Sequence, residues 1–250
     1  MTAHPLLESL LIEAARLQAS DLHLIAGLPA SLRVNGEILF IGNDALHSED
    51  LEAISIQLLN PTQLATFATD WELCVSLNHE VAGRLRVTAY RHNGRIEFSF
   101  RFCGSDIPSR EELGLPDKID DLARKPNGLV LVCGATGAGK TTTLNYMVNV
   151  INHERRCKIV TIEDPIEHVH RNHKAIVVQQ ELLTDTHSFR RALTHVLRQD
   201  PDVIVVGEMR EPETIMTALT AAETGHLVLS TLHSTSATQA IERITGIFDG

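Results

Sequence analysis

The stretch Gly134-Ala135-Thr136-Gly137-Ala138-Gly139-Lys140-Thr141 fits the pattern G-x-x-x-x-G-K-[ST] of a phosphate-binding loop. The apolar run at residues 129–133 precedes it and predicts a buried parallel strand. Residues 140 to about 152 predict a helix, so the motif stands in the context it needs. A glycine turn before a helix is the simplest alternative. The glycine order G-x-x-G-x-G disfavours a dinucleotide-binding fold, whose order is G-x-G-x-x-G.

Each part of this loop has an expected physical task. The glycines let the backbone approach phosphate oxygens, and the loop amides with the helix N-terminus supply donors and a positive dipole. Lys140 is expected to reach the β- and γ-phosphates, and the Thr141 hydroxyl to bind Mg²⁺. The sequence therefore predicts ATP and Mg²⁺ as ligands. The predicted nucleotide-binding residues are Gly134, Ala135, Thr136, Gly137, Ala138, Gly139, Lys140, Thr141 and Thr142.

Composition limits the other possibilities. The 250 residues include 43% hydrophobic and 22% charged side chains, which is typical of a globular chain of one large or two ordinary domains. With 22 basic and 32 acidic residues the net charge is −10, which argues against a broad nucleic-acid surface. The four cysteines form no C-x-x-C pair and indicate a reducing compartment. No apolar run approaches the roughly 18 residues of a membrane span, so a cytoplasmic chain is expected.

The first hundred residues predict short strands and amphipathic helices. Helices are expected at residues 6–17, from Ser48 and from Asn60, and strands at residues 21–25, 31–34, 37–41, 84–91 and 95–102. Asn35-Gly36 and Asn93-Gly94 are hairpin signals. Residues 103–128 are rich in proline and glycine, so we expect a domain boundary near residues 104–109.

The second hairpin places several arginines on one face in an acidic chain. Arg84 and Arg86 alternate with apolar residues on its first strand, and Arg95, Glu97, Ser99 and Arg101 share one face of its second strand. This face has two interpretations. It is a solvated surface, or it is an anion-facing surface for a nucleotide held by another domain or subunit.

After the phosphate loop, strands and helices alternate. Strands are expected at residues 158–162, 175–179, 203–206 and 227–231, and helices at residues 188–199, 212–223 and 237–244. This alternation predicts an α/β fold with a mainly parallel sheet. Ligands in such sheets bind at the carboxyl ends of the strands.

Polar groups follow three of these strands. Glu163-Asp164 suits metal coordination or water positioning, and the alternative is a strand-end turn. Glu208 follows a strand at the Walker B position, where Gly207 replaces the usual Asp, and it is the candidate to orient or deprotonate water. His233 is expected to sense the γ-phosphate, unless it is a structural histidine. A further cluster, His168, His170 and His173, lacks partners at metal-ligand spacing and favours a loop surface.

Taken together these motifs resemble the secretion-ATPase superfamily, specifically its type IV pilus retraction ATPases. Residues 134–143 look like the Walker A stretch of that family, residues 161–167 like its Asp box, residues 198–210 like its Walker B region and residues 224–233 like its His box. Near the start, residues 19–36 are similar to the retraction branch. The resemblance covers almost the whole chain.

The resemblance implies a PAS-like α/β domain at residues 1–105 and a RecA-like P-loop ATPase domain at residues 106–250. It implies a homo-hexamer that hydrolyses Mg²⁺-ATP at the cytoplasmic face of the bacterial inner membrane. Its partners would be an inner-membrane platform protein and, indirectly, pilin, with no nucleic acid and no membrane insertion. Arg86 and Arg101 match arginines that reach the nucleotide from the first domain. The expected catalytic set is Glu208, Glu163, His233, Arg86 and Arg101, with Thr141 and Glu163 as metal ligands.

Alternatives remain open on sequence alone. The family's C-terminal helical part would follow Gly250, so the chain is expected to be either a fragment or a shortened homologue. A secretion ATPase for a substrate other than pilin would carry the same motifs. A non-hydrolysing regulatory subunit is a further alternative, against which the intact Glu163, Glu208 and His233 count. A nucleic-acid motor is disfavoured by the acidic charge.

Overall fold

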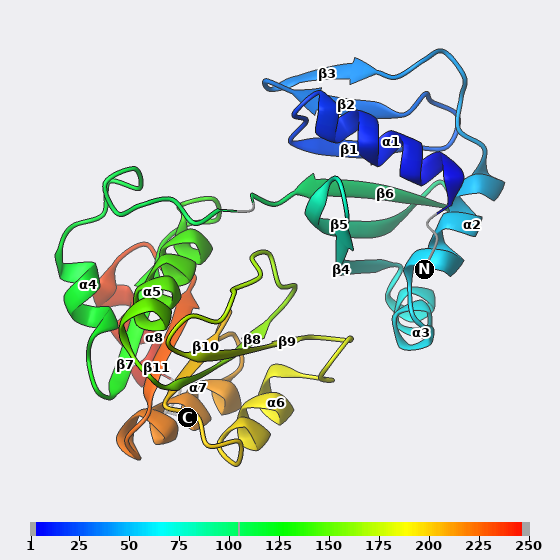
Figure 1. Cartoon of the computed structure of the whole chain (residues 1–250). Helices are drawn as coiled ribbons and strands as arrows, with labels where there is room; N and C mark the ends of the chain where they lie inside the picture. The colour runs from blue at the N-terminus through cyan, green and yellow to red at the C-terminus, as the bar shows by residue number, and fades with distance from the viewer. Residues whose placement is uncertain (1–3, 105, 247–250) are drawn as a thin grey trace. The chain divides into compact units, whose positions relative to one another are not determined.

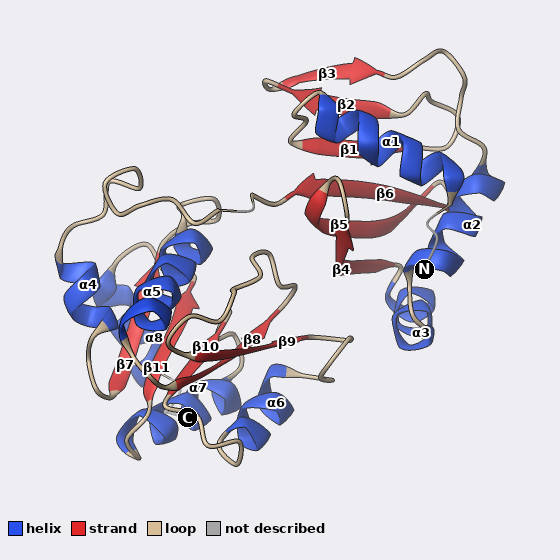
Figure 2. Ribbon diagram, viewed as in Figure 1, coloured by secondary structure: helices blue, strands red, loops and turns tan. Residues whose placement is uncertain are grey.

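The structure is a computed structural model that describes residues 4–104 and 106–246 (Figure 1). Contacts divide these residues into two compact units. The first unit comprises the residues up to 104 together with Pro165–His168, and the second comprises Asp106–Asp164 and the residues from Val169 onward. Each unit has a sheet and helices of its own (Figure 2).

The first unit is built on a six-stranded antiparallel sheet. Its elements are α1 (Pro5–Arg16), β1 (Asp21–Leu24), β2 (Ser31–Val34), β3 (Glu37–Phe40), α2 (Ser48–Leu58), α3 (Pro61–Asp70), β4 (Glu72–His79), β5 (Gly83–His92) and β6 (Arg95–Phe102). The strand order is β3-β2-β1-β6-β5-β4. The sheet therefore joins the two predicted hairpins through the β1–β6 pair.

Local sequence explains the turns and one helix start in this unit. Asn35 and Gly36 have φ of 50° and 88°, and Asn93 and Gly94 have φ of 50° and 76°. Two consecutive residues at positive φ are what a tight hairpin turn requires, so both predicted hairpins are confirmed. The Asn60 side chain caps α3 by accepting a hydrogen bond from the backbone amide of Gln63. In return, the Gln63 side-chain oxygen accepts a hydrogen bond from the backbone amide of Asn60.

The polar face of the arginine hairpin is solvated only in part. A solvated polar face on β6 would leave Glu97 in water, but Glu97 is buried and its Oε1 lies 2.8 Å from Nδ1 of His92. The side chain is tolerated there because the imidazole supplies a polar partner. Arg95 and Arg101 on the same face are exposed, as a solvated face requires.

The second unit is a five-stranded sheet in which every recorded pair is parallel. Its elements are α4 (Lys118–Ala123), β7 (Gly128–Cys133), α5 (Lys140–Glu154), β8 (Lys158–Glu163), β9 (Ile176–Glu181), α6 (Phe189–Val196), β10 (Val203–Val206), α7 (Pro212–Glu223), β11 (Leu227–Leu232) and α8 (Ala237–Thr245). The strand order is β7-β11-β10-β8-β9.

Helices cover both faces of this sheet, which explains the continuous apolar runs of its strands. On β10, Ile204 and Val206 pack in one cluster with α6, α7 and α8, while Val203 and Val205 pack in the other with α4 and α5. The predicted fold class, an N-terminal α/β unit followed by an ATPase unit with a mainly parallel sheet, is confirmed by this architecture and by the structural matches reported below.

Two elements, β4 and α4, were not predicted, and the bounds of α6 and β9 differ from the expectation. Helix α6 is shorter than residues 188–199, because Asp200 adopts a left-handed φ of 55° before Pro201 and the preceding turn tightens. Strand β9 runs on to Glu181, because its parallel register with β8 continues as far as Glu163.

Candidate active site

The phosphate loop connects β7 to α5, and its glycines have identifiable tasks. Gly137 and Gly139 have φ of 79° and 84°, a region that glycine enters without strain. Gly134 has an ordinary φ, but a Cβ at this position would lie 3.2 Å from the Cβ of Ala138. A side chain at the start of the loop would therefore push Ala138 outward by a few tenths of an ångström, which glycine avoids.

The Lys140 ammonium is held by its own loop. Its Nζ donates to the carbonyl oxygens of Gly134 at 3.0 Å and of Ala135 at 2.8 Å. Lys140 is buried, whereas residues 135–139, Thr141 and Thr142 are exposed. An ammonium has three N–H donors, so one remains for a phosphate oxygen. The loop thus presents exposed backbone and one anchored cation to any ligand.

Parallel pairing brings the other predicted groups to one edge of the sheet. Ile162 pairs with Val206, and Val206 pairs with Ser230, so β8, β10 and β11 are in register. Glu163 is the last residue of β8, and Glu208 and His233 follow the ends of β10 and β11. The β7 end, which opens the phosphate loop, lies at the same edge because β7 pairs in parallel with β11.

Glu163 is buried and held by two donors. Thr161 Oγ1 donates to its Oε1 at 2.6 Å and Gln179 Nε2 donates to the same oxygen at 3.0 Å. Bonds from neutral donors fix the orientation of a carboxylate and offset part of the cost of burying its charge. Sequence reasoning did not identify Gln179, because only the β8–β9 register brings it to Glu163.

Glu208 and His233 lie together. Glu208 Oε2 is 3.7 Å from His233 Nε2, and Glu208 Oε1 is 2.8 Å from Arg210 Nε. The Glu208 side chain is 21% exposed, so it is accessible while held by the guanidinium. Arg210 was not predicted as a site residue. The available signal was its position two residues after Glu208, which places a permanent cation within reach of the carboxylate.

Asp164 belongs to the same acidic group. Partial burial raises the pKa of the Asp164 carboxyl, the negative charges of Glu208 and Glu181 raise it further, and Arg210 lowers it. Part of the Asp164 surface stays open to solvent. Carboxylates that raise one another's pKa are a usual feature of cation-binding and catalytic edges.

Gly207 stands where an aspartate is usual at the Walker B position, and the space there is tight. A Cβ at this position would lie 3.3 Å from the Ile162 carbonyl oxygen and 3.5 Å from the Glu163 Cα. A side chain here would require the end of β8 to shift by a few tenths of an ångström. For Mg²⁺ the described residues offer the Thr141 hydroxyl and the Glu163 carboxylate, which are hard oxygen donors of the kind that Mg²⁺ takes together with substrate phosphates.

Both predicted arginines of the first unit are paired. Arg86 Nη1 lies 2.7 Å from Glu167 Oε1, next to Arg84, whose Nε donates to the Ile166 carbonyl oxygen at 2.7 Å. Arg101 Nε lies 2.9 Å from Asp21 Oδ1. Arg86 and Arg101 therefore form ion pairs with carboxylates of their own unit.

The histidine cluster does not form a metal site in the part of the chain that the structure describes, where no group of three or more His, Cys, Asp or Glu side chains is arranged to hold an ion. His170 is buried, and its Nε2 lies 3.2 Å from Asn145 Oδ1. His173 instead stacks on His153, with ring centroids 3.9 Å apart. Both contacts are structural.

Comparison with known proteins identifies the family. The family model described as "Type II/IV secretion system protein" matches residues 110–247, which is more than half of the chain. The chain belongs to this secretion system family. The predicted resemblance is thereby confirmed.

Individual members of this secretion system family extend the match to the first unit. The type IV pilus retraction ATPase PilT of Pseudomonas aeruginosa is 44% identical over 96% of the chain and 70% of its own length. The type IV pilus ATPase PilU of the same organism is 41% identical over 92% of the chain and 60% of its own length. The chain thus spans roughly two thirds of these relatives.

Solved structures agree. A crystal structure of the pilus retraction motor PilT with bound ADP matches 96% of the chain, with a TM-score of 0.89 and 40% identity, over 71% of that chain. The Legionella pneumophila ATPase DotB matches 100% of the chain at a TM-score of 0.89 and 30% identity, over 72% of that chain. The prediction of an ATPase is confirmed by these family matches. Among the described residues, no helix is long and apolar enough to cross a bilayer.

Proposed function

We propose that this chain hydrolyses Mg²⁺-ATP in a homo-hexameric ring and thereby powers retraction of a type IV pilus, the motion that underlies twitching motility. The observation that carries the proposal is the arrangement of Glu163, Glu208 and His233 at the edge of the sheet where the phosphate loop begins. Its support from relatives is the 44% identity to PilT. The ring would act at the cytoplasmic face of the inner membrane through a platform protein, and on pilin only indirectly.

The proposed chemistry depends on positioning and charge rather than on covalent steps. Lys140 and the loop amides hold the β- and γ-phosphates. Thr141 and Glu163 would hold Mg²⁺, which when bound would supply positive charge against the phosphate oxygens. Glu208 orients the attacking water and accepts its proton. His233 lies beside Glu208, where it can respond to the presence of the γ-phosphate.

Arg210 is part of this proposal because it holds one oxygen of Glu208. The 2.8 Å contact uses Oε1 and leaves Oε2 facing His233 at 3.7 Å. A water between Oε2 and the γ-phosphate would then meet a carboxylate whose orientation is already fixed. Fixing the base in advance lowers the entropy cost of reaching the reactive geometry.

The test is a comparison of Glu208→Gln with Glu163→Gln in steady-state ATP hydrolysis and in nucleotide binding. Glu208→Gln keeps the shape of the side chain but removes the base, so turnover should fall by about two orders of magnitude or more. ATP affinity should change by less than about tenfold, roughly 1.4 kcal/mol. Glu163→Gln should lower turnover and should also make ATP binding less dependent on Mg²⁺. If the Glu208→Gln enzyme remained active, the general base would have to be a residue other than Glu208.

Retraction is separable from secretion of another substrate. The family model, described as a Type II/IV secretion system protein, fits a secretion ATPase equally well. Expression of the whole gene in a bacterium that lacks its retraction ATPase decides between them. Restored twitching supports the pilus motor, whereas ATP hydrolysis without restored twitching supports export of another substrate. Absence of hydrolysis in the purified protein would favour a regulatory subunit.

A further inference from the structure

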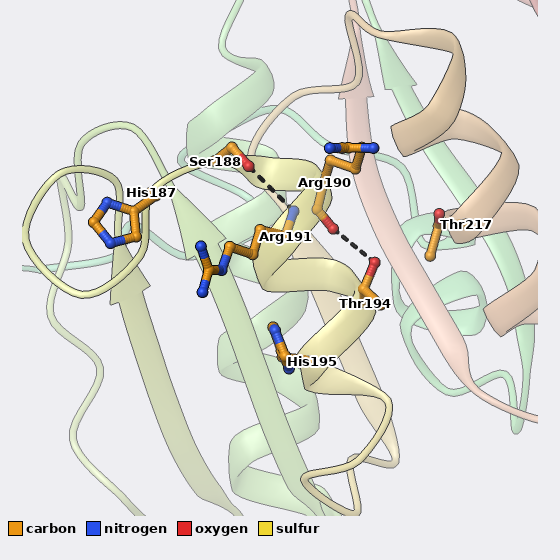
Figure 3. A pocket seen from close by; sticks show the side chains of 7 residues that line it. All are labelled: His187, Ser188, Arg190, Arg191, Thr194, His195 and Thr217. Carbon is orange, nitrogen blue, oxygen red and sulfur yellow. Dashed lines mark hydrogen bonds between the residues drawn. The ribbon is translucent and has the colours of Figure 1, made fainter.

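A hollow of about 550 Å³ lies at the start of α6 and contains none of the candidate active-site residues. It is lined by His187, Ser188, Arg190, Arg191, Thr194, His195 and Thr217 (Figure 3). None of these side chains is a large hydrophobic group, and none is a carboxylate. In a chain with ten more acidic than basic residues, a hollow lined by two guanidinium and two imidazole groups is an unusual concentration of N–H donors.

The donors stand in two groups along the helix. Arg191 and His195 are four residues apart on α6 and lie on the same side of the helix as His187, which belongs to the loop before it (Figure 3). Arg190 and Thr194 lie on the side of Thr217 from α7. A ligand that meets both groups must carry negative charge at more than one point.

The hydroxyl groups are already positioned by the backbone. Thr194 Oγ1 donates to the Arg190 carbonyl oxygen at 2.9 Å, and Thr217 Oγ1 donates to the Glu213 carbonyl oxygen at 2.8 Å. Ser188 Oγ accepts from the Arg191 amide, so its own proton remains available to a ligand. The donors that face the hollow are therefore mainly the charged and imidazole groups, and the hollow selects an anion.

Two carboxylates border this site, because Glu211 and Glu213 line the adjoining hollow together with Ser188 and Arg190. Glu213 Oε2 lies 3.3 Å from Arg190 Nε, and both side chains are well exposed. An exposed pair of this kind contributes about 1 kcal/mol or less, so a multiply charged ligand can displace it. Guanidinium groups suit phosphate because they stay charged and donate two parallel bonds. A single carboxylate would fill only a small part of 550 Å³.

We propose that this hollow binds an anion with two or more phosphate groups, and that it recognises the phosphates rather than a base or an acyl chain. The site is independent of the proposed ATP site, because its lining shares no residue with the phosphate loop or with the carboxylate edge. The same chemistry is available from a free oligophosphate and from the phosphates of an anionic lipid surface.

The experiment uses the whole chain with Lys140→Ala, so that the phosphate loop contributes less to binding. Inorganic pyrophosphate is titrated at low salt by calorimetry, and the His187 and His195 imidazole signals are followed by NMR. The matched control is Arg156→Ala, because Arg156 is an exposed arginine that precedes β8, away from the hollow lining. Pyrophosphate should bind the control and the parent alike and shift both imidazole signals.

Arg190→Ala with Arg191→Ala should weaken binding at least tenfold. Glu213→Gln removes the competing charge and should tighten binding about threefold, an effect that misfolding cannot produce. Unchanged affinity in the double variant overturns the proposal. The proposal is also overturned if the double variant changes the size of the assembly and leaves pyrophosphate affinity unchanged, because the hollow would then be a contact between copies.

A second arm identifies the source of the phosphates. Vesicles of neutral phospholipid are compared with vesicles that contain phosphatidylglycerol, with the same variants and no pyrophosphate. Binding to pyrophosphate but not to anionic vesicles assigns a free oligophosphate. Arginine-dependent binding to anionic vesicles alone keeps the phosphate recognition and assigns the lipid source. Binding to neither overturns the proposal.

Discussion

At the scale of single residues, Lys140 has a contact pattern that makes a direct prediction. Its ammonium bridges two carbonyl groups of the loop and keeps one donor for a phosphate. Lys140→Ala should therefore abolish measurable ATP hydrolysis and weaken ATP binding by at least tenfold. Lys174→Ala is the matched control because Lys174 is an exposed lysine before β9. Normal turnover in Lys140→Ala, measured by phosphate release, would contradict the assignment of the phosphate loop.

Asp164 predicts a pH-dependent effect on stability. Its folded-state pKa is raised, so the folded chain binds this proton more tightly than the unfolded chain and the ionised carboxylate is unfavourable in the fold. The cost is therefore present above the folded-state pKa and disappears as pH falls below the unfolded value. Asp164→Asn should stabilise the protein near pH 7 and give no gain at strongly acid pH.

The expected gain is small, because Asp164 is partly exposed and solvent screens its neighbours. It should stay below about 1 kcal/mol, which corresponds to an increase in Tm of at most about 2–4 °C. Thermal unfolding at several pH values measures it. Asp185→Asn offers a comparison carboxylate that is exposed and lies after β9. A destabilised Asp164→Asn at neutral pH would show that the charge itself is needed for folding.

At the scale of elements, patterns with a local cause were predicted from the sequence. The Asn-Gly hairpins, the Asn60 cap and the loop between β7 and α5 each depend on residues that are neighbours in the chain. Strand β4 lacked such a signal, since it follows α3 after the single residue Trp71. Trp71 adopts a left-handed φ of 61°, and this conformation can be expected from the sequence only at residues such as glycine or asparagine.

Contacts between distant residues were beyond sequence reasoning. The sequence placed Glu163, Glu208 and His233 at strand ends, and parallel topology was enough to predict a common edge. The partners of these groups were not predictable in the same way. Gln179 reaches Glu163 through strand register, and Arg210 contacts Glu208 within the irregular segment that follows β10. The functional roles of these residues stay predictions.

The β5 strand and the segment after the Asp box form an element-scale contact with a testable consequence. Arg86 is paired with Glu167, so it must leave this partner before it can act on a phosphate. Glu167→Gln should release it and increase turnover by about two- to fivefold, the factor that corresponds to a partly exposed ion pair of up to about 1 kcal/mol. Arg86→Ala and Arg101→Ala should both slow hydrolysis.

Steady-state rates at saturating ATP test this prediction, with Glu72→Gln as an exposed control on the neighbouring β4. The opposite signs expected for Glu167→Gln and Arg86→Ala distinguish a released arginine from a damaged fold. If Glu167→Gln slows hydrolysis as much as Arg86→Ala does, the pair is structural. Normal rates in both Arg86→Ala and Arg101→Ala would make the hairpin face a solvated surface only.

At the scale of the whole molecule, the question is whether Arg86 serves the ATP site of its own chain or of a neighbour in the proposed ring. Arg86 is paired with Glu167 of its own unit and has to leave this partner in either case. The two possibilities predict opposite results when Arg86 and Glu208 are removed from different chains of one assembly.

Mixed assemblies distinguish the two possibilities. Arg86→Ala and Glu208→Gln chains are co-expressed with different affinity tags, and assemblies that carry both tags are isolated. If Arg86 acts within its own chain, no site in the mixture has both groups intact, and turnover should stay as low as in the two parent variants. If it acts on a neighbour, a Glu208→Gln chain can supply its arginine to an Arg86→Ala chain that keeps Glu208, and part of the activity returns. Recovered turnover in the doubly tagged fraction would therefore assign the arginine to the interface between copies.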